Sequence, residues 1–307
     1  MGLLNRNRNI FDYFKKKISK KYLKKVSKKY LKERNQLVVF SFDFISQSIY
    51  IDGRFEDSEL NFVENNFKKF LKNSVVLDIG ANIGNHTVSF SKYAKKVYAF
   101  EPNQKVFEVL ELNTRDLNNV EIFNYGASNK KQSIIAKIPK FNCGGGSVVS
   151  EVKSAFKDNF LNLTFNLAAL DKLKKIQSDK IGLVKIDIEG HELEAFKGMQ
   201  QILKKHQPII LFEQNRGIVN GSSDVINFLK SIGYENLYEL KKVDDWILKK
   251  FLPKKFMPKL FKSLFELIEI LIIGAPSNKL KLELITSLTK DEYDMLVMSN
   301  LKLNKQN

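Results

Sequence analysis

The chain is nearly free of cysteine, since Cys143 is the only one in 307 residues. A single cysteine excludes an internal disulfide and any zinc site built from several thiolates. Long apolar runs are also missing: the stretch 264–275 contains Glu266 and Glu269 and falls short of the roughly 20 residues that cross a bilayer. The first thirty residues hold no apolar core, so no signal peptide is expected. These absences favour a reducing, cytoplasmic location.

Arginine is scarce although the chain is strongly basic, with 51 Lys and Arg, 34 Asp and Glu and a net charge of +17. Planar arginine suits bidentate phosphate binding, so an excess of lysine favours a diffuse attraction to an anionic surface. Residues 1–36 carry 13 Lys or Arg against two acids, hence +11. Their apolar residues recur at helical steps, which predicts a basic amphipathic helical extension. These are Phe11, Phe14, Ile18, Tyr22, Val26 and Tyr30.

Three partners fit such an extension. Basic amphipathic helices lie on anionic membranes, and we expect this contact through residues 1–34 and 246–275, peripherally at the inner membrane face. The helix could instead pack on its own domain with solvated lysines, or bind nucleic acid. The segment 246–276 is a basic, aromatic-rich insertion in a second unit that spans 37–307. It could be an interfacial helix, a dimer contact or a lid.

That second unit is organised around the stretch 75–102. An apolar run ends in Asp78, Gly80 and Gly84 follow, and a second apolar run ends in Glu101. The pattern predicts a buried strand, a glycine turn, a helix near His86 capped by Asn85, and another strand. A helix N-terminus and a carboxylate that accepts from two ribose hydroxyls suit a nucleoside ligand.

The glycine spacing differs from the dinucleotide fingerprint. An acid precedes the first glycine, and Asn82 and His86 stand in the turn. A pyrophosphate requires a third glycine and a bare helix end. An anion at Asp78 better suits a ligand with a sulfonium and an ammonium, which points to S-adenosylmethionine.

A second informative stretch is KIDIEGHE, at 185–192. Alternation predicts Lys185, Asp187 and Glu189 on one side of a strand, with Asp187 at its carboxyl end. Ile209 to Phe212 predicts another strand, which ends at Glu213. Ionisable groups at strand ends are costly to bury unless they are paired or used. A surface turn held by salt bridges is the alternative.

The stretches DIGANIGNHTVSF, AFEP and KIDIEGHE, in this order, resemble the FkbM-type S-adenosylmethionine-dependent methyltransferases over roughly residues 51–238. The resemblance implies an α/β fold of class I, Rossmann-like and doubly wound, with a seven-stranded, mostly parallel sheet that ends in an antiparallel hairpin. It also implies O-methylation of a sugar hydroxyl in a glycan, glycolipid or secondary metabolite. The cofactor residues it indicates are Glu56, Asp78, Gly80, Ala81, Asn82, Gly84, His86, Glu101, Pro102 and Ser128.

The catalytic group stays open among Asp187, His191, Glu189 and Lys185, since an alcohol acceptor must lose its proton. Asp187 and Glu213 could instead hold Mg²⁺ that acidifies a hydroxyl. A base N-methyltransferase would carry a Pro-Pro-aromatic motif, and this chain has no Pro-Pro. Two rival functions stay open, a ribose 2'-O-methyltransferase acting on RNA and a non-catalytic adaptor that binds a membrane or nucleic acid.

The rest of the unit alternates between predicted strands and helices. We expect one or two short strands within 37–52, and then a helix over 56–71 that brings Glu56 near the cofactor. Asp171 is predicted to have a structural role at a helix start. Two last strands, 280–285 and 293–299, are predicted to form the C-terminal hairpin. The loops 139–165, with its glycine turn at 142–147, and 214–224 are expected to bind the acceptor.

Overall fold

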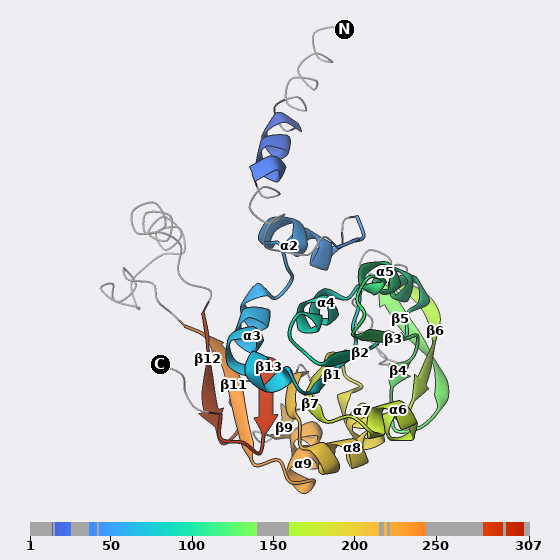
Figure 1. The fold of residues 1–307 in the computed structure, drawn as a ribbon, viewed down its shortest axis with the longest axis vertical. Helices are drawn as coiled ribbons and strands as arrows, with labels where there is room; N and C mark the ends of the chain where they lie inside the picture. The colour runs from blue at the N-terminus through green and yellow to red at the C-terminus, as the bar shows by residue number, and fades with distance from the viewer. Residues whose placement is uncertain are drawn as a thin grey trace, which may run out of the picture.

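The computed structural model describes residues 14, 16–25, 37–41, 43–139, 160–214, 218–219, 222–243, 279–290 and 293–303. Within these residues, an eight-stranded sheet has the order β12-β11-β13-β8-β7-β1-β2-β3 (Figure 1). Its strands are β1 (Val75–Ile79), β2 (Lys96–Phe100), β3 (Val120–Phe123), β7 (Ile181–Ile186), β8 (Ile209–Gln214), β11 (Asn236–Lys242), β12 (Leu280–Ile285) and β13 (Tyr293–Ser299).

Five neighbouring strands, β3, β2, β1, β7 and β8, are parallel. Every residue of β1 is buried, as expected for a strand covered on both faces. Alternation sends Leu77 into the larger core cluster and Val76 into a second cluster on the opposite face. The carboxyl ends of these strands meet at one edge of the sheet.

Helices cover both faces of the sheet. The face of Val76 packs against α3 (Asp57–Leu71) and α4 (Asn85–Ser91), and α5 (Gln104–Thr114) contacts the same side through Leu110. The face of Leu77 packs against α7 (Glu192–Gly198), α8 (Gln200–His206) and α9 (Asp224–Ser231). A short 3-10 turn, η1 (Leu170–Lys172), precedes α6 (Lys174–Gln177). The doubly wound α/β fold class is therefore confirmed.

A second, three-stranded sheet lies beside the β3 edge (Figure 1). It consists of β4 (Gly126–Ala127), β6 (Phe160–Ala168) and β5 (Gln132–Pro139). β6 pairs with β4 in parallel and with β5 antiparallel, and Phe165, Leu167 and Ile138 form its small core. A two-stranded ribbon of β9 (Ile218–Val219) and β10 (Ser222–Ser223) precedes α9.

Two details of the predicted sheet are wrong. The described sheet has eight strands rather than seven, and the C-terminal strands do not form a hairpin. β11 lies between β12 and β13 and pairs antiparallel with both. β12 is therefore the edge strand, added beside β11.

The predicted strands within 37–52 are also wrong, because α2 (Phe44–Asp52) is a helix. The Asp43 side chain accepts a hydrogen bond from the backbone N–H of Ser46, and Gly53, with φ of 83°, ends the helix. Both capping residues are local signals that outweigh the partial alternation of apolar residues between them.

The described part of the basic extension is helical over 16–25, and every residue there is exposed. Figure 1 shows this helix (blue) projecting beyond α2, away from the sheet. In the part of the chain that is described, no helix is both long and apolar enough to cross a membrane. The predicted insertion at 246–276, the glycine turn at 142–147 and Cys143 lie outside the described residues.

Candidate active site

A cavity of about 280 Å³ opens at the carboxyl edge of the parallel strands. Residues at the ends of β1, β2, β7 and β8 line it, namely Gly80, Glu101, Asp187 and Glu213. Parallel strands of a doubly wound sheet place ligand sites at this edge. The remaining lining is Phe44, Ile45, Phe55, Glu56, Asn82, Pro102, Asn103, Gly126, Ala127, Ile138, Phe165, Leu167, Ile188, Glu189 and His191.

Gly80 lets the ends of β1 and β7 come close together. Its φ of 78° is left-handed, and a Cβ at this position would overlap the carbonyl oxygen of Asp187. The backbone N–H of Gly80 donates to the carbonyl of Phe100 at 3.0 Å, and that of Asp187 donates to Ile79. A glycine is therefore required where three strand ends converge.

Glu101 places its carboxylate in the cavity wall. One oxygen accepts from the backbone N–H of Asn82 at 3.0 Å, and the other accepts from that of Asn103 at 2.9 Å. Burial raises the pKa of Glu101 to about 7, against the lowering effect of these two backbone donors. Each oxygen keeps a second lone pair, so the carboxylate can accept two further hydrogen bonds.

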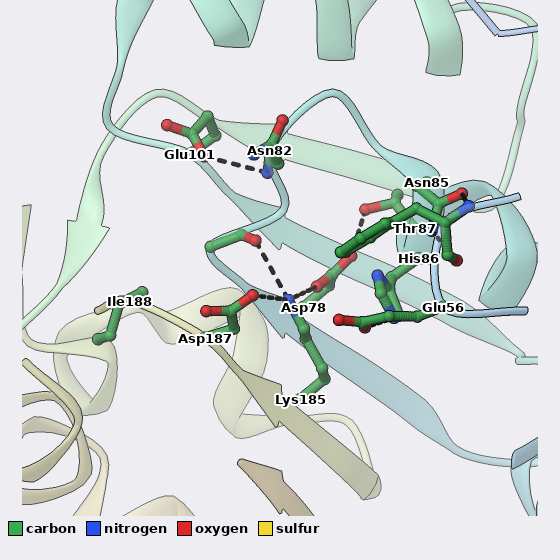
Figure 2. Close-up of polar contacts among 12 residues, drawn as sticks. Glu56, Asp78, Asn82, Asn85, His86, Thr87, Glu101, Lys185, Asp187 and Ile188 are labelled. Carbon is green, nitrogen blue, oxygen red and sulfur yellow. Dashed lines mark hydrogen bonds and ion pairs between the residues drawn. The ribbon is translucent and has the colours of Figure 1, made fainter. Parts of the chain in front are cut away.

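Lys185 is the buried cation of the site (Figure 2). Its Nζ donates to the carbonyl of Gly80 at 3.3 Å and lies 3.4 Å from Asp187 Oδ2 and 3.9 Å from Asp78 Oδ1. Burial alone would lower the pKa of Lys185, but Asp187 and the other surrounding carboxylates raise it. Lys185 therefore stays charged and connects the glycine turn to both aspartates.

Asp78 is completely buried beneath the turn and is absent from the cavity lining. Thr87 Oγ1, from α4, donates to Asp78 Oδ2 at 2.5 Å. Asp78 Oδ1 has no hydrogen-bond partner among the described residues, and Lys185 supplies the nearby positive charge. Asp78 thus supports the turn from below.

The segment between α2 and α3 closes another side of the cavity (Figure 2). Asn85 accepts from the backbone N–H of Phe55 at 3.2 Å and donates to the Phe55 carbonyl at 2.9 Å. Glu56 has a left-handed φ of 52°, and its Oε2 lies 3.1 Å from His86 Nε2. Burial opposes ionisation of Glu56, but His86 and Lys185 lower its pKa overall. Asn85 does not cap α4 as predicted; Gly84 precedes that helix, and Asn85 fixes Phe55 instead.

The KIDIEGHE stretch supplies another part of the cavity wall. β7 ends at Ile186, so Glu189 lies in a turn rather than on the strand, with φ of 54°. Asp187, Glu189 and His191 all line the cavity, and Glu213 joins them from β8. No group of three or more potential metal ligands occurs among the described residues. Asp187 and Glu213 share the cavity without forming such a group.

The structure divides the predicted cofactor residues into two sets. Glu56, Gly80, Asn82, Glu101 and Pro102 line the cavity. The others support the wall from behind and do not line it: Asp78, Ala81, Gly84, His86 and Ser128.

Sequence reasoning missed the apolar part of the lining. Phe44 and Ile45 come from the segment predicted as strands, Phe55 lies between α2 and α3, and Phe165 and Leu167 come from β6. The Asp43 cap and Gly53 could have indicated the helix that carries the first two. No local signal indicates that β6 reaches the cavity.

These residues fit S-adenosylmethionine. Glu101 has two acceptor sites for a pair of ribose hydroxyls, and the apolar surfaces of Pro102 and Ala127 lie beside it in the lining. The carboxylates of Glu56 and Asp187 give the Gly80 side the negative charge that a sulfonium and an ammonium require. The carboxylates of the cavity therefore match both polar ends of this ligand, the ribose and the charged methionine part.

Comparison with known proteins finds one family model and several methyltransferases. The family described as "Methyltransferase FkbM domain" matches residues 78–236. "Hexuronic acid methyltransferase AglP" of Haloferax volcanii is 32% identical over 142 residues, which are 46% of this chain and 56% of that protein. "Probable ribosomal RNA small subunit methyltransferase A" of Pyrococcus abyssi is 31% identical over 99 residues, 32% of this chain and 34% of that protein.

The crystal structure of methyltransferase FkbM from Methylobacillus flagellatus is 18% identical, with a TM-score of 0.38, and covers 56% of this chain and 40% of that one. The chain thus spans only about a third to a half of the length of the curated relatives it matches. The family match extends from Asp78 through the KIDIEGHE stretch and covers more than half of the chain. The chain belongs to the FkbM methyltransferase family.

Proposed function

We propose that this protein is an S-adenosylmethionine-dependent O-methyltransferase that methylates a sugar hydroxyl. The observation that carries the proposal is the Glu101 carboxylate, held by two backbone donors in a cavity wall that also contains Asp187 and His191. When bound, S-adenosylmethionine supplies an activated methyl group. The hexuronic acid methyltransferase of Haloferax volcanii supports a sugar as the class of acceptor.

The chain's own residues then have three tasks. Glu101 accepts hydrogen bonds from the cofactor's ribose, and Lys185 fixes the glycine turn and Asp187 in one arrangement. Asp187 takes the proton of the acceptor hydroxyl, because it lines the cavity at the end of β7. The cavity walls hold the acceptor near the methyl group, which is the main requirement for transfer from an activated donor.

A ribose 2'-O-methyltransferase acting on RNA is the second candidate, and the ribosomal RNA methyltransferase of Pyrococcus abyssi supports RNA as its class of acceptor. In this second candidate, Lys185 and Asp187 would act on a ribose hydroxyl of an RNA that binds to the basic surface of the protein. Lys185 is only 3% exposed and is bonded beneath the glycine turn, which suits support of the site better than contact with a polynucleotide.

We further propose that the N-terminal helix brings the enzyme to an anionic membrane surface. Residues 16–25 carry six lysines and no acid, and Phe14, Ile18 and Tyr22 are exposed at helical spacing. Their exposed fractions of 56%, 68% and 48% leave about half or more of each of these side chains open to solvent. Lysines near an anionic leaflet contribute roughly 1 kcal/mol each.

The test combines binding and product analysis. Calorimetry on the full-length protein is expected to show S-adenosylmethionine binding, and its absence would refute the proposed enzymatic function. Mass spectrometry of glycans and lipids from cells with and without the gene is expected to show one lost methyl group on a sugar. A lost methyl on ribosomal RNA, with unchanged glycans, would favour the second candidate.

A further inference from the structure

His191 makes a specific contact behind the cavity wall. The residue precedes α7, lines the cavity, and places its Nε2 3.0 Å from Ser128 Oγ. Ser128 follows β4 and is completely buried. Because this hydroxyl is fully buried and lies against one ring nitrogen, it limits which of the two nitrogens of His191 can carry hydrogen.

The backbone fixes this contact from both sides. α7 approaches so closely that a Cβ at Gly198 would overlap the carbonyl oxygen of Ser128. The Ser128 N–H donates to the carbonyl of Ala168 at 2.9 Å, and Asn129 donates to Glu194 on α7. The separation of Ser128 from α7 is therefore set by packing and not by the histidine itself.

The hydrogen bonds of Ser128 define the direction of the contact. Gln132 Nε2 donates to Ser128 Oγ at 3.0 Å, so the hydroxyl oxygen is already an acceptor. The hydroxyl has a single hydrogen, and leaving it without an acceptor in a buried place costs about 1–3 kcal/mol. His191 Nε2 is the acceptor within the described residues that this hydrogen can use. The arrangement that satisfies every group has Ser128 donating to Nε2.

The surroundings also favour a neutral ring. Burial lowers the pKa of His191, and the nearby Glu194 opposes this only in part. Three further acids, Asp187, Glu189 and Glu213, line the same cavity as His191, and Glu192 follows it in the first turn of α7. In a neutral imidazole one nitrogen accepts and the other carries hydrogen.

We propose that Ser128 is a positioning residue that holds His191 in the tautomer with hydrogen on Nδ1. In this state His191 offers the acceptor a hydrogen-bond donor and is not the base that removes its proton. The O–H bond of the acceptor then breaks with its electron pair left on oxygen, and the proton passes to a carboxylate oxygen of Asp187. The proposal rests on the proposed methyltransferase function for its chemistry, but the tautomer is a property of the free protein.

The test is nuclear magnetic resonance of the full-length protein labelled with ¹⁵N-histidine, without cofactor, at a pH where His191 is neutral. The chain has three histidines, so His191→Asn assigns the relevant signals by their disappearance. We expect the Nδ1 of His191 to give a protonated-nitrogen shift and Nε2 an unprotonated one. The opposite assignment in the wild type would overturn the proposal, whatever the variants do.

Two variants test the role of the hydroxyl. Ser128→Ala should release Nε2, so that the Nε2–H form becomes populated and the His191 pKa rises, whereas Ser128→Thr should keep the wild-type pattern. Signals of His86 and His206 serve as internal controls for the fold. An unchanged tautomer in Ser128→Ala, with the controls unmoved, would remove Ser128 from this role. Failure of the protein to bind S-adenosylmethionine in a separate titration would refute the methyltransferase function and leave the tautomer result standing.

Discussion

Replacing Glu101 with glutamine should weaken S-adenosylmethionine binding and remove its pH dependence. The two carboxylate oxygens each accept one backbone N–H and keep one lone pair for a ribose hydroxyl. An amide has only one oxygen, so its NH₂ group would face the N–H of either Asn82 or Asn103. Hydrogen bonds to a charged group contribute about 1.5–3 kcal/mol, which predicts a roughly 10- to 150-fold increase in Kd.

The pH dependence follows from the raised pKa of about 7. Ribose hydroxyls donate to the ionised carboxylate, so binding should be full above this pKa and should weaken about tenfold for each pH unit below it. At pH 6 about one tenth of the sites would be ionised, which costs about 1.4 kcal/mol of binding. The folding stability of the protein without cofactor should change with pH in the opposite direction to cofactor binding. A raised carboxyl pKa contributes stability that is complete below the ordinary value of 4.5 and is lost as pH rises through about 7.

Isothermal calorimetry at pH 6, 7 and 8 measures both effects, in buffers of different ionisation enthalpy so that proton release on binding is counted. Glu108→Gln makes the same chemical change on the exposed side of α5 and should match the wild type. A wild-type Kd that is constant over this pH range, together with an unchanged Kd in Glu101→Gln, would refute the reasoning.

Three further predictions concern catalysis, the turn and the helix. Asp187→Asn should lower methyl transfer to the acceptor by about 10²–10⁴-fold at saturating cofactor, and full activity would exclude Asp187 as the base. Gly80→Ala should lower Tm and cofactor affinity much more than Gly233→Ala, because both have positive φ but only Gly80 also meets Asp187; equal effects would contradict this. Full-length protein should co-sediment with anionic vesicles at low salt and less at high salt, and a chain that starts at Asn35 should not; unchanged sedimentation after the deletion would exclude the helix as the anchor.

The frame of the site could be predicted from local sequence signals. Strand periodicity and the glycines located β1, β2, β7 and β8, and chain order placed Gly80, Glu101, Asp187 and Glu213 at their carboxyl ends. These features depend on contacts within a few residues and on the common direction of parallel strands. The structural role predicted for Asp171 is also confirmed, but through a long-range contact: its side chain accepts from the backbone N–H groups of Gln201 and Ile202 at the start of α8.

The division between residues that face the cavity and residues that support it depends on tertiary packing. Asp78 and Lys185 stand at strand ends like Asp187, yet the turn covers both, because β1 and β7 approach at Gly80. The position of β11 between β12 and β13 depends on which strands pair with each other, which strand patterns do not encode. Ser128 meets His191 because α7 packs on its backbone at Gly198, a contact between residues 70 positions apart in the chain. Long-range packing of this kind leaves no periodic signal in the sequence, so the supporting residues of the site could not be separated from the lining ones in advance.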